Sequence, residues 1–162
     1  MSVEDKLAVA ETIYRYATGV DTRDFALYRS IFAPEVAFDF SSYNGGHAAV
    51  MTGDAWVGGV RPLFTGLAAT QHSMTNPVAE IDGDSARCRM YMQAHHVYVP
   101  DDPNSWFTIG GYYDDTLVRS AHGPAGWLIT AVTLTVLWRM GDPTIMIAAA
   151  SAGRATLEGA KS

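Results

Sequence analysis

The chain has 162 residues, the usual length of one domain, and 48% of them are apolar against 17% charged, which excludes a disordered protein. The formal net charge of −6 makes nucleic acid and anionic membrane surfaces poor partners. Cys88 is the only cysteine, so a disulfide framework and a thiolate zinc cage are both excluded. The charged N-terminal stretch lacks the apolar core of a signal peptide, and the apolar run 127–138 is too short to span a bilayer as a helix. We therefore expect one soluble cytoplasmic domain.

Helical periodicity dominates the first part of the chain. Apolar residues recur at helical spacing over 3–19 and again over 22–32, which predicts two consecutive amphipathic helices. Pro34 is expected to end the second helix. Residues 35–43 then alternate as a strand does, and a third, short helix is expected over 52–64.

From residue 68 onward the sequence reads as β structure. Strands are expected over 78–81, 85–99, 105–119 and 127–139. The order ααβα followed by an antiparallel meander predicts an α+β fold, in which a curved sheet wraps on three helices as a cone with an internal pocket. This domain is expected to cover residues 1–140. Residues 141–162 form a tail that is partly helical or flexible, and that covers the pocket mouth or a neighbouring subunit or frays in solvent.

Strand alternation sorts the histidines between the two faces of the sheet. His95 and His96 are adjacent on a predicted strand and must point to opposite faces. Counting by twos groups His96 with Met90 and Met92 on the apolar face that the helices cover, and leaves His95 on the outer or intersubunit face. The same alternation places His72 on the apolar face. Two imidazoles are therefore expected to look into one apolar pocket.

Asp21, between the first two predicted helices, is a carboxylate that could partner His72. Its plainest role is helix capping, because Asp21-x-x-Asp24 is a reasonable N-cap arrangement, and a hydrogen-bonded core histidine is likewise the commoner role for His72 and His96. A carboxylate partner in a desolvated site would instead tune a histidine as a base. Two His and one Asp could also form a metal-binding facial triad, but the usual close-spaced H-x-D or H-x-E pair is absent, so we expect no metal.

Four separated segments resemble the SnoaL-like branch of the nuclear-transport-factor-2-like superfamily in order and spacing, over about residues 4–140. They are YATGVDTRDFALYRSIFAPEVAFDF, TQHSMTN, IDGDSARCRMYMQAHH and GWLITAVTLTVLW. In the dehydratases of that superfamily, scytalone dehydratase and bile-acid dehydratase among them, an aspartate orients a histidine base. The resemblance implies that Asp21 and His72 are this dyad, that His96 is a second pocket histidine, and that Tyr16 takes the place of a catalytic tyrosine.

The chain departs from the scytalone dehydratase pattern at several positions. Val20 and Phe40 stand where that enzyme has tyrosines, and its pocket asparagine falls at Asp114. The tyrosines that would hold water are therefore missing, and Tyr16 or Tyr43 is expected to substitute for them. The superfamily also contains isomerases, cyclases and binding modules, so membership alone does not fix the activity.

The sequence and the resemblance together suggest a lyase without a cofactor that eliminates water from a cyclic or aromatic-fused hydroxyketone. Asp21 would accept the Nδ1 proton of His72, so that Nε2 of His72 removes a proton next to a carbonyl. Tyr16 or Tyr43, with His96, would hydrogen-bond the developing enolate or protonate the leaving hydroxyl. The side chains expected to bind this small hydrophobic substrate are Phe40, Tyr43, Trp56, Met90, Met92, Asp114 and Trp138. An isomerase or cyclase acting on a similar ketone, and a non-catalytic small-molecule binder, are the alternatives.

The outer face of the predicted sheet is amphipathic enough to join subunits. Its side chains on the second long strand are Arg87, Arg89, Tyr91, Gln93 and His95. Because the dehydratases that the chain resembles are trimers, the resemblance favours a homotrimer, with a dimer as the second choice.

Overall fold

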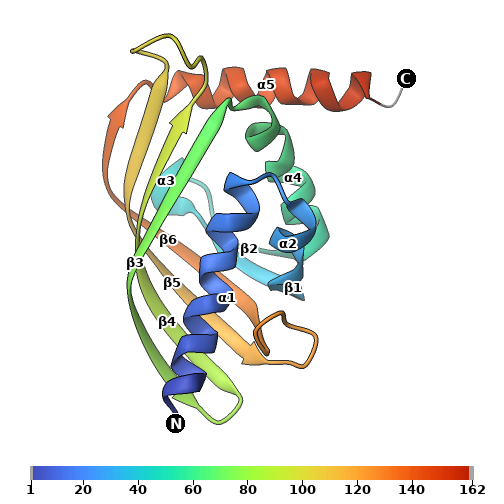
Figure 1. Cartoon of the computed structure of the whole chain (residues 1–162), viewed down its shortest axis with the longest axis vertical. Coiled ribbons are helices and arrows are strands. Elements are labelled where there is room, and N and C mark those ends of the chain that lie inside the picture. Colours follow the sequence, from blue (N-terminus) through green and yellow to red (C-terminus); the bar gives the residue numbers. More distant parts are fainter. Residues whose placement is uncertain (1, 161–162) are drawn as a thin grey trace.

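The computed structural model describes residues 2–160, and its six strands form one curved, open sheet (Figure 1). The strands are β1 (Phe32–Asp39), β2 (Ala49–Thr52), β3 (Ala69–Asp82), β4 (Ser85–Val97), β5 (Trp106–Arg119) and β6 (Trp127–Gly141). They lie in the order β2-β1-β6-β5-β4-β3, in which only β1 and β6 pair in parallel. The expected α+β cone is confirmed.

Five helices are described between residues 2 and 160. They are α1 (Val3–Asp21), α2 (Phe25–Ser30), α3 (Ser41–Asn44), α4 (Gly53–Gly66) and α5 (Thr144–Gly159). Helices α1, α2 and α4 lie on the concave side of the sheet, and α5 runs across one end of it (Figure 1). None of the described helices is both long and apolar enough to cross a membrane.

Helix α1 crosses the concave face of the sheet and carries the candidate site at its C-terminal end. Its N-terminus is capped by Ser2, whose hydroxyl accepts a hydrogen bond from the backbone N–H of Asp5. Val9, Ile13 and Val20 recur at helical spacing and are buried. Because this apolar stripe fixes the rotation of the helix, the residues that follow Val20 are placed beside the start of β3.

Pro34 does not end the second helix, as the sequence analysis expected. Helix α2 already ends at Ser30, and Pro34 lies inside β1. Proline has no N–H to donate to a sheet ladder. The pairing of β1 with β6 is accordingly irregular between Phe32 and Ala37, which accommodates the proline within the strand.

Strand β3 begins nine residues earlier than the segment 78–81 that was expected, at Ala69. The segment TQHSMTN is therefore part of the strand, and its residues Thr70 to Thr75 pair with β4. The pairing shifts register between Thr75 and Val78, where Asn76 has a φ of 55° before Pro77. This irregularity is a β-bulge, and it leaves His72 in the regular half of the strand.

The C-terminal tail forms helix α5, which packs closely against α4. A Cβ added to Gly66 would lie 1.8 Å from the carbonyl oxygen of Ala149, and one added to Gly153 would lie 1.8 Å from that of Pro62. The absence of side chains at these two glycines is what allows the helix backbones to touch. Helix α5 is thereby tied to α4 across one end of the sheet (Figure 1).

We expect Gly153→Val to lower the free energy of unfolding by about 2 kcal/mol, because the added side chain has no space against α4. Urea denaturation would measure the loss. Gly58→Ala in α4 is the control, since a Cβ there meets nothing within 4 Å and alanine favours a helix by roughly 0.5 kcal/mol or more. A Gly153→Val protein as stable as the wild type would contradict the close contact of the two helices.

Candidate active site

The last residue of α1 and the fourth residue of β3 form a carboxylate–imidazole pair. Oδ1 of Asp21 lies 2.7 Å from Nδ1 of His72, and the backbone N–H of His72 donates to Oδ2 at 2.7 Å. The hydroxyl of Thr70 also donates to Oδ1, at 2.8 Å. Because an ionised carboxylate only accepts hydrogen bonds, the neutral form of His72 carries its proton on Nδ1, which leaves a lone pair on Nε2.

Asp21 is not the cap of the second helix. That role belongs to Asp24, whose Oδ1 accepts a hydrogen bond from the backbone N–H of Leu27. Burial acts to raise the pKa of Asp21, but the hydrogen bond and charge of His72, its backbone N–H and the Thr70 hydroxyl together hold that pKa below its ordinary value. Asp21 is therefore ionised at neutral pH and able to orient the ring of His72.

The Nε2 atom of His72 is the free end of this pair. Nε2 makes no hydrogen bond within residues 2–160. Among the fully buried side-chain oxygens and nitrogens of these residues, only Oδ1 of Asp115 lacks a hydrogen-bond partner, so Nε2 of His72 is not among the fully buried atoms. Nε2 therefore retains accessible surface, although only 5% of the His72 side chain is exposed. The hollow of about 790 Å³ between α1 and the bulge of β3 is not lined by His72.

His96 lies on the inner face of β4 with its ring centroid 5.7 Å from that of His72. Nδ1 of His96 is 3.0 Å from the carbonyl oxygen of Phe107, which can only accept, so the proton of His96 is on Nδ1. Burial, with the neighbouring His72 as a second cause, lowers the pKa of His96 to about 4. Because the ring of His96 is neutral and its Nε2 carries no proton, Nε2 can accept a hydrogen bond but cannot donate one. The sequence analysis expected His96 to act as a donor.

Tyr16 packs beside His72 and belongs to a cluster of buried tyrosines. Its ring centroid is 6.4 Å from that of His72, 4.9 Å from that of Tyr28 and 5.4 Å from that of Tyr113. Trp56, expected only as an apolar wall, donates its indole N–H to the hydroxyl of Tyr28 at 2.8 Å. Burial raises the pKa of Tyr16 and that of Tyr113 well above the ordinary value, so both hydroxyls keep their protons at neutral pH.

Further aromatic and methionine side chains that were expected to bind substrate lie in the interior near the tyrosines and histidines. The ring of Phe40 lies 4.9 Å from that of Trp56 and 6.4 Å from that of Tyr113, which links α4 to β5. Met90 and Met92 are buried on the inner face of β4, where alternation places them. Tyr43 lies in α3 with Arg139 over its ring.

Residues 1–133 match the sequence profile of the SnoaL-like domain. The chain belongs to this family. Similar solved structures include the Kfla4162 protein from Kribbella flavida, with 26% identity, 93% of this chain and 97% of that chain covered, and a TM-score of 0.77. A candidate aromatic ring hydroxylase from Novosphingobium aromaticivorans shares 24% identity over 90% and 99% of the two chains, with a TM-score of 0.75. A candidate scytalone dehydratase from the same organism shares 18% identity over 85% and 87%, with a TM-score of 0.72. The search of curated proteins found no match.

Two residues expected in the pocket lie on the outer face of the sheet in this SnoaL-like domain. Asp114 forms a double hydrogen bond with the Arg89 guanidinium, 2.7 Å at each oxygen. Trp138 is 41% exposed, and its ring occupies the position that a Cβ on Gly110 would need. The structure therefore does not bring Asp114 or Trp138 to the dyad.

The inward neighbour of Asp114 is a carboxyl group that the sequence analysis did not single out. Asp115 is 3% exposed on the inner face of β5, and its Oδ1 has no hydrogen-bond partner. Burial, reinforced by the nearby charge of Asp114, raises the pKa of Asp115 well above its ordinary value. The buried position of Asp115 therefore favours the neutral, protonated form of its carboxyl group. Strand alternation from Tyr113 was the signal that could have located it.

Two further polar residues of the site were missed as well. Thr70 precedes His72 by two residues, so alternation alone puts both on one face of β3. Arg23 follows Asp21 by two residues and reaches Thr70 with its guanidinium. Within residues 2–160, no three His, Cys, Asp or Glu side chains gather as ligands for a metal ion.

Proposed function

We propose that this SnoaL-like protein is a lyase that needs no cofactor and removes water from a cyclic or aromatic-fused hydroxyketone. The observation that carries the proposal is the Asp21–His72 pair, in which both carboxylate oxygens bind His72 and Nε2 is left free. Membership of the SnoaL-like family and the shared fold of a candidate scytalone dehydratase support it.

The reaction begins with proton transfer to His72. Nε2 takes a proton from the carbon next to the carbonyl, and the electron pair of that C–H bond moves into an enolate. The enolate then forms a carbon–carbon double bond as the hydroxyl on the next carbon leaves. The proton held by His72 passes to that hydroxyl, so water is released and the base is regenerated. Asp21 stabilises the imidazolium that exists between the two proton transfers.

Two neighbouring groups suit the substrate oxygens. The protonated phenol of Tyr16 can donate to the carbonyl oxygen as it gains negative charge. The bare Nε2 of His96 can accept a hydrogen bond from a further hydroxyl of the substrate. General acid–base help of this kind supplies roughly 10²- to 10⁴-fold, so the carbon that loses its proton must already be acidified by a carbonyl.

An isomerase acting on a similar ketone is the second candidate. The observation that favours it is the free Nε2 of His72, because a base that has taken a proton there can return it to a carbon atom as well as to a leaving hydroxyl. In that reaction His72 would return the proton to a different carbon, and no water would leave.

A panel of cyclic hydroxyketones tests the proposal, with loss of one water followed by mass spectrometry and formation of the enone by absorbance. We expect wild-type turnover and a loss of at least about 10³-fold in His72→Gln. His47→Gln, which changes an exposed loop histidine, is the matched control and should turn over as the wild type does. Equal rates in wild type and His72→Gln would overturn the mechanism. Double-bond migration without loss of mass would assign the isomerase instead.

A further inference from the structure

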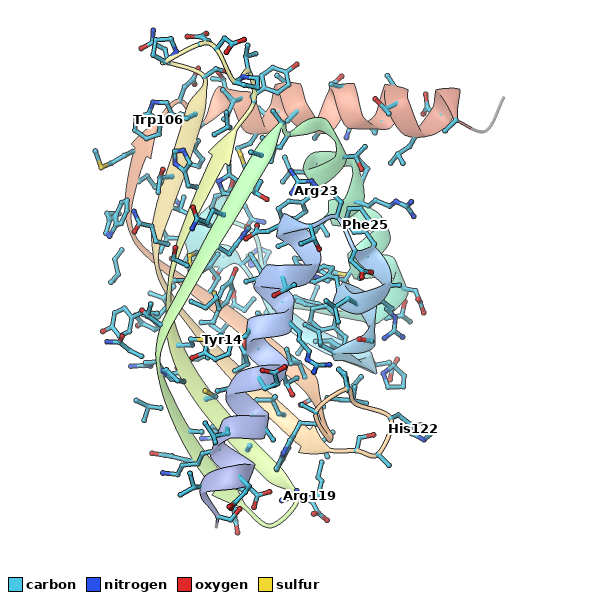
Figure 2. All side chains as sticks on the ribbon, viewed as in Figure 1. Tyr14, Arg23, Phe25, Trp106, Arg119 and His122 are labelled. Atoms are coloured by element: carbon cyan, nitrogen blue, oxygen red, sulfur yellow. The ribbon has the colours of Figure 1, made fainter. Side chains whose placement is uncertain are left out.

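The guanidinium of Arg23, which lies where α1, α4 and β3 meet (Figure 2), makes four hydrogen bonds. Nη1 donates to the carbonyl oxygens of Val20 and Asp21 at 2.8 and 3.0 Å and to the Thr70 hydroxyl at 2.7 Å, and Nη2 donates to the carbonyl of Leu67 at 3.1 Å. The first two bonds stay at the end of α1. The other two cross to the segment that carries the base.

The hydrogen bond from Arg23 fixes the direction of the Thr70 hydroxyl proton. A guanidinium can only donate, so the oxygen of Thr70 accepts from Arg23. The proton of Thr70 is therefore available for Oδ1 of Asp21, 2.8 Å away. That same oxygen accepts from Nδ1 of His72 at 2.7 Å. The result is a directed chain from a guanidinium through a hydroxyl to the carboxylate that holds the imidazole.

We propose that Arg23 and Thr70 are positioning residues for the His72 base. Arg23 polarises the Thr70 hydroxyl, and this hydroxyl holds Oδ1 of Asp21 in place while withdrawing charge from it. Asp21 is thereby kept as an oriented carboxylate that does not bind the imidazolium too tightly. The catalytic part of this inference rests on the proposed function, whereas the hydrogen-bonded chain stands without it.

A simpler role for Arg23 is to close the end of α1. The backbone already does this, because the N–H groups of Thr22 and Arg23 donate to Thr18 and Val20. Arg23 also has a φ of 62°, in the left-handed region that favours glycine or asparagine. Capping alone would therefore suit a smaller residue. The guanidinium is half-buried and reaches the Asp21 carboxylate only through Thr70, which is what a positioning role requires.

Thr70→Val separates the two roles, because it removes the hydroxyl and leaves the bonds at the end of α1 in place. We expect kcat to fall about tenfold with KM changed less than twofold. Without the Thr70 donor, Asp21 attracts the imidazolium more strongly, so the acidic limb of the pH–rate profile should move to higher pH. Thr70→Ser keeps the hydroxyl and should restore both values. Thr75→Val, on the outer face of the same strand, is the matched control.

Nuclear magnetic resonance of ¹⁵N-labelled histidine gives a readout that does not need turnover. The wild type should show the Nδ1–H tautomer of His72 with a low-field proton. In Thr70→Val and in Arg23→Asn the resonance of this proton should shift and the proton should exchange faster with solvent. Asparagine is chosen at position 23 because it tolerates the left-handed backbone there. Wild-type kinetics and a wild-type Nδ1–H signal in Thr70→Val would overturn the inference. If no hydroxyketone reacts but the signal changes, the positioning chain stands and the proposed function fails. If His72→Gln is inactive but Thr70→Val matches the wild type, the proposed function stands and the positioning role of Thr70 fails.

Discussion

Asp21→Asn is expected to lower kcat by about 10³- to 10⁴-fold without unfolding the protein. Both oxygens of Asp21 accept hydrogen bonds from His72, one from the backbone N–H and one from Nδ1–H. An asparagine has only one oxygen to offer. If its amide nitrogen faces the ring, Nδ1 must become the acceptor and the proton moves to Nε2, so His72 can no longer act as a base there.

Steady-state kinetics on a hydroxyketone identified by the panel would measure this loss. Asp24→Asn is the matched control, because asparagine caps a helix as well as aspartate does and Asp24 binds only the start of α2. We expect the control to keep the wild-type rate. An Asp21→Asn protein within tenfold of the wild-type kcat would show that the tautomer of His72 is not set by this carboxylate.

Asp115→Asn is expected to stabilise the protein at neutral pH, by an amount that grows with pH. Burial raises the pKa of Asp115 in the folded state, so the folded protein keeps a proton that the unfolded chain releases. The stability contribution of this group is therefore full below the unfolded pKa of about 3.9 and is lost as pH rises towards the folded pKa. In that window the free energy of unfolding falls by at most about 1.4 kcal/mol for each pH unit because of Asp115. An asparagine does not ionise, so the variant does not lose this free energy.

Urea denaturation of both proteins at several pH values between 4 and 8 would measure the difference. The pKa of His96 is lowered from 6.5 to about 4, so its own contribution is present above pH 6.5 and is lost as pH falls through that window. Both proteins carry His96, and its effect cancels in the comparison. Asp101→Asn, which changes an exposed carboxylate in the loop between β4 and β5, should leave the pH dependence of the wild type unchanged. Parallel stability curves for wild type and Asp115→Asn would refute the neutral state of Asp115.

Strand alternation was enough to predict which side chains share the interior. His72 and His96 face inward as expected because a period of two is a local property of each strand, and the pairing of β3 with β4 preserves it. The contact between Asp21 and His72 joins residues 51 positions apart. Alternation carries no information on such a contact. The residues alone offered Asp21 as one possible partner of His72, and only the resemblance to a family assigned the two as a dyad.

Assigning pocket residues by their correspondence to a family was wrong at strand positions, where an error of one residue moves a side chain to the other face of the sheet. The position of a pocket asparagine was assigned to Asp114, but Tyr113 and Asp115 are the inward-facing residues of β5. Trp138 belongs to the end of β6 after the register shift opposite Gly110 and Gly111, which places it outside. The parallel pairing of β1 with β6 and the short strand β2 depend on long-range contacts that no local pattern records.

The hydrogen bond from the backbone of His72 to Asp21 also bears on how the protein avoids aggregation. Strand β3 is an edge of the sheet, and the N–H of His72 donates to Asp21 and not to a neighbouring strand. An unpaired edge amide is a point at which a strand of another chain can add. By occupying this amide, Asp21 makes β3 a poorer template for intermolecular pairing. The carboxylate that orients the proposed base thus also protects a sheet edge, and a substitution that retunes the chemistry at Asp21 acts on solubility as well.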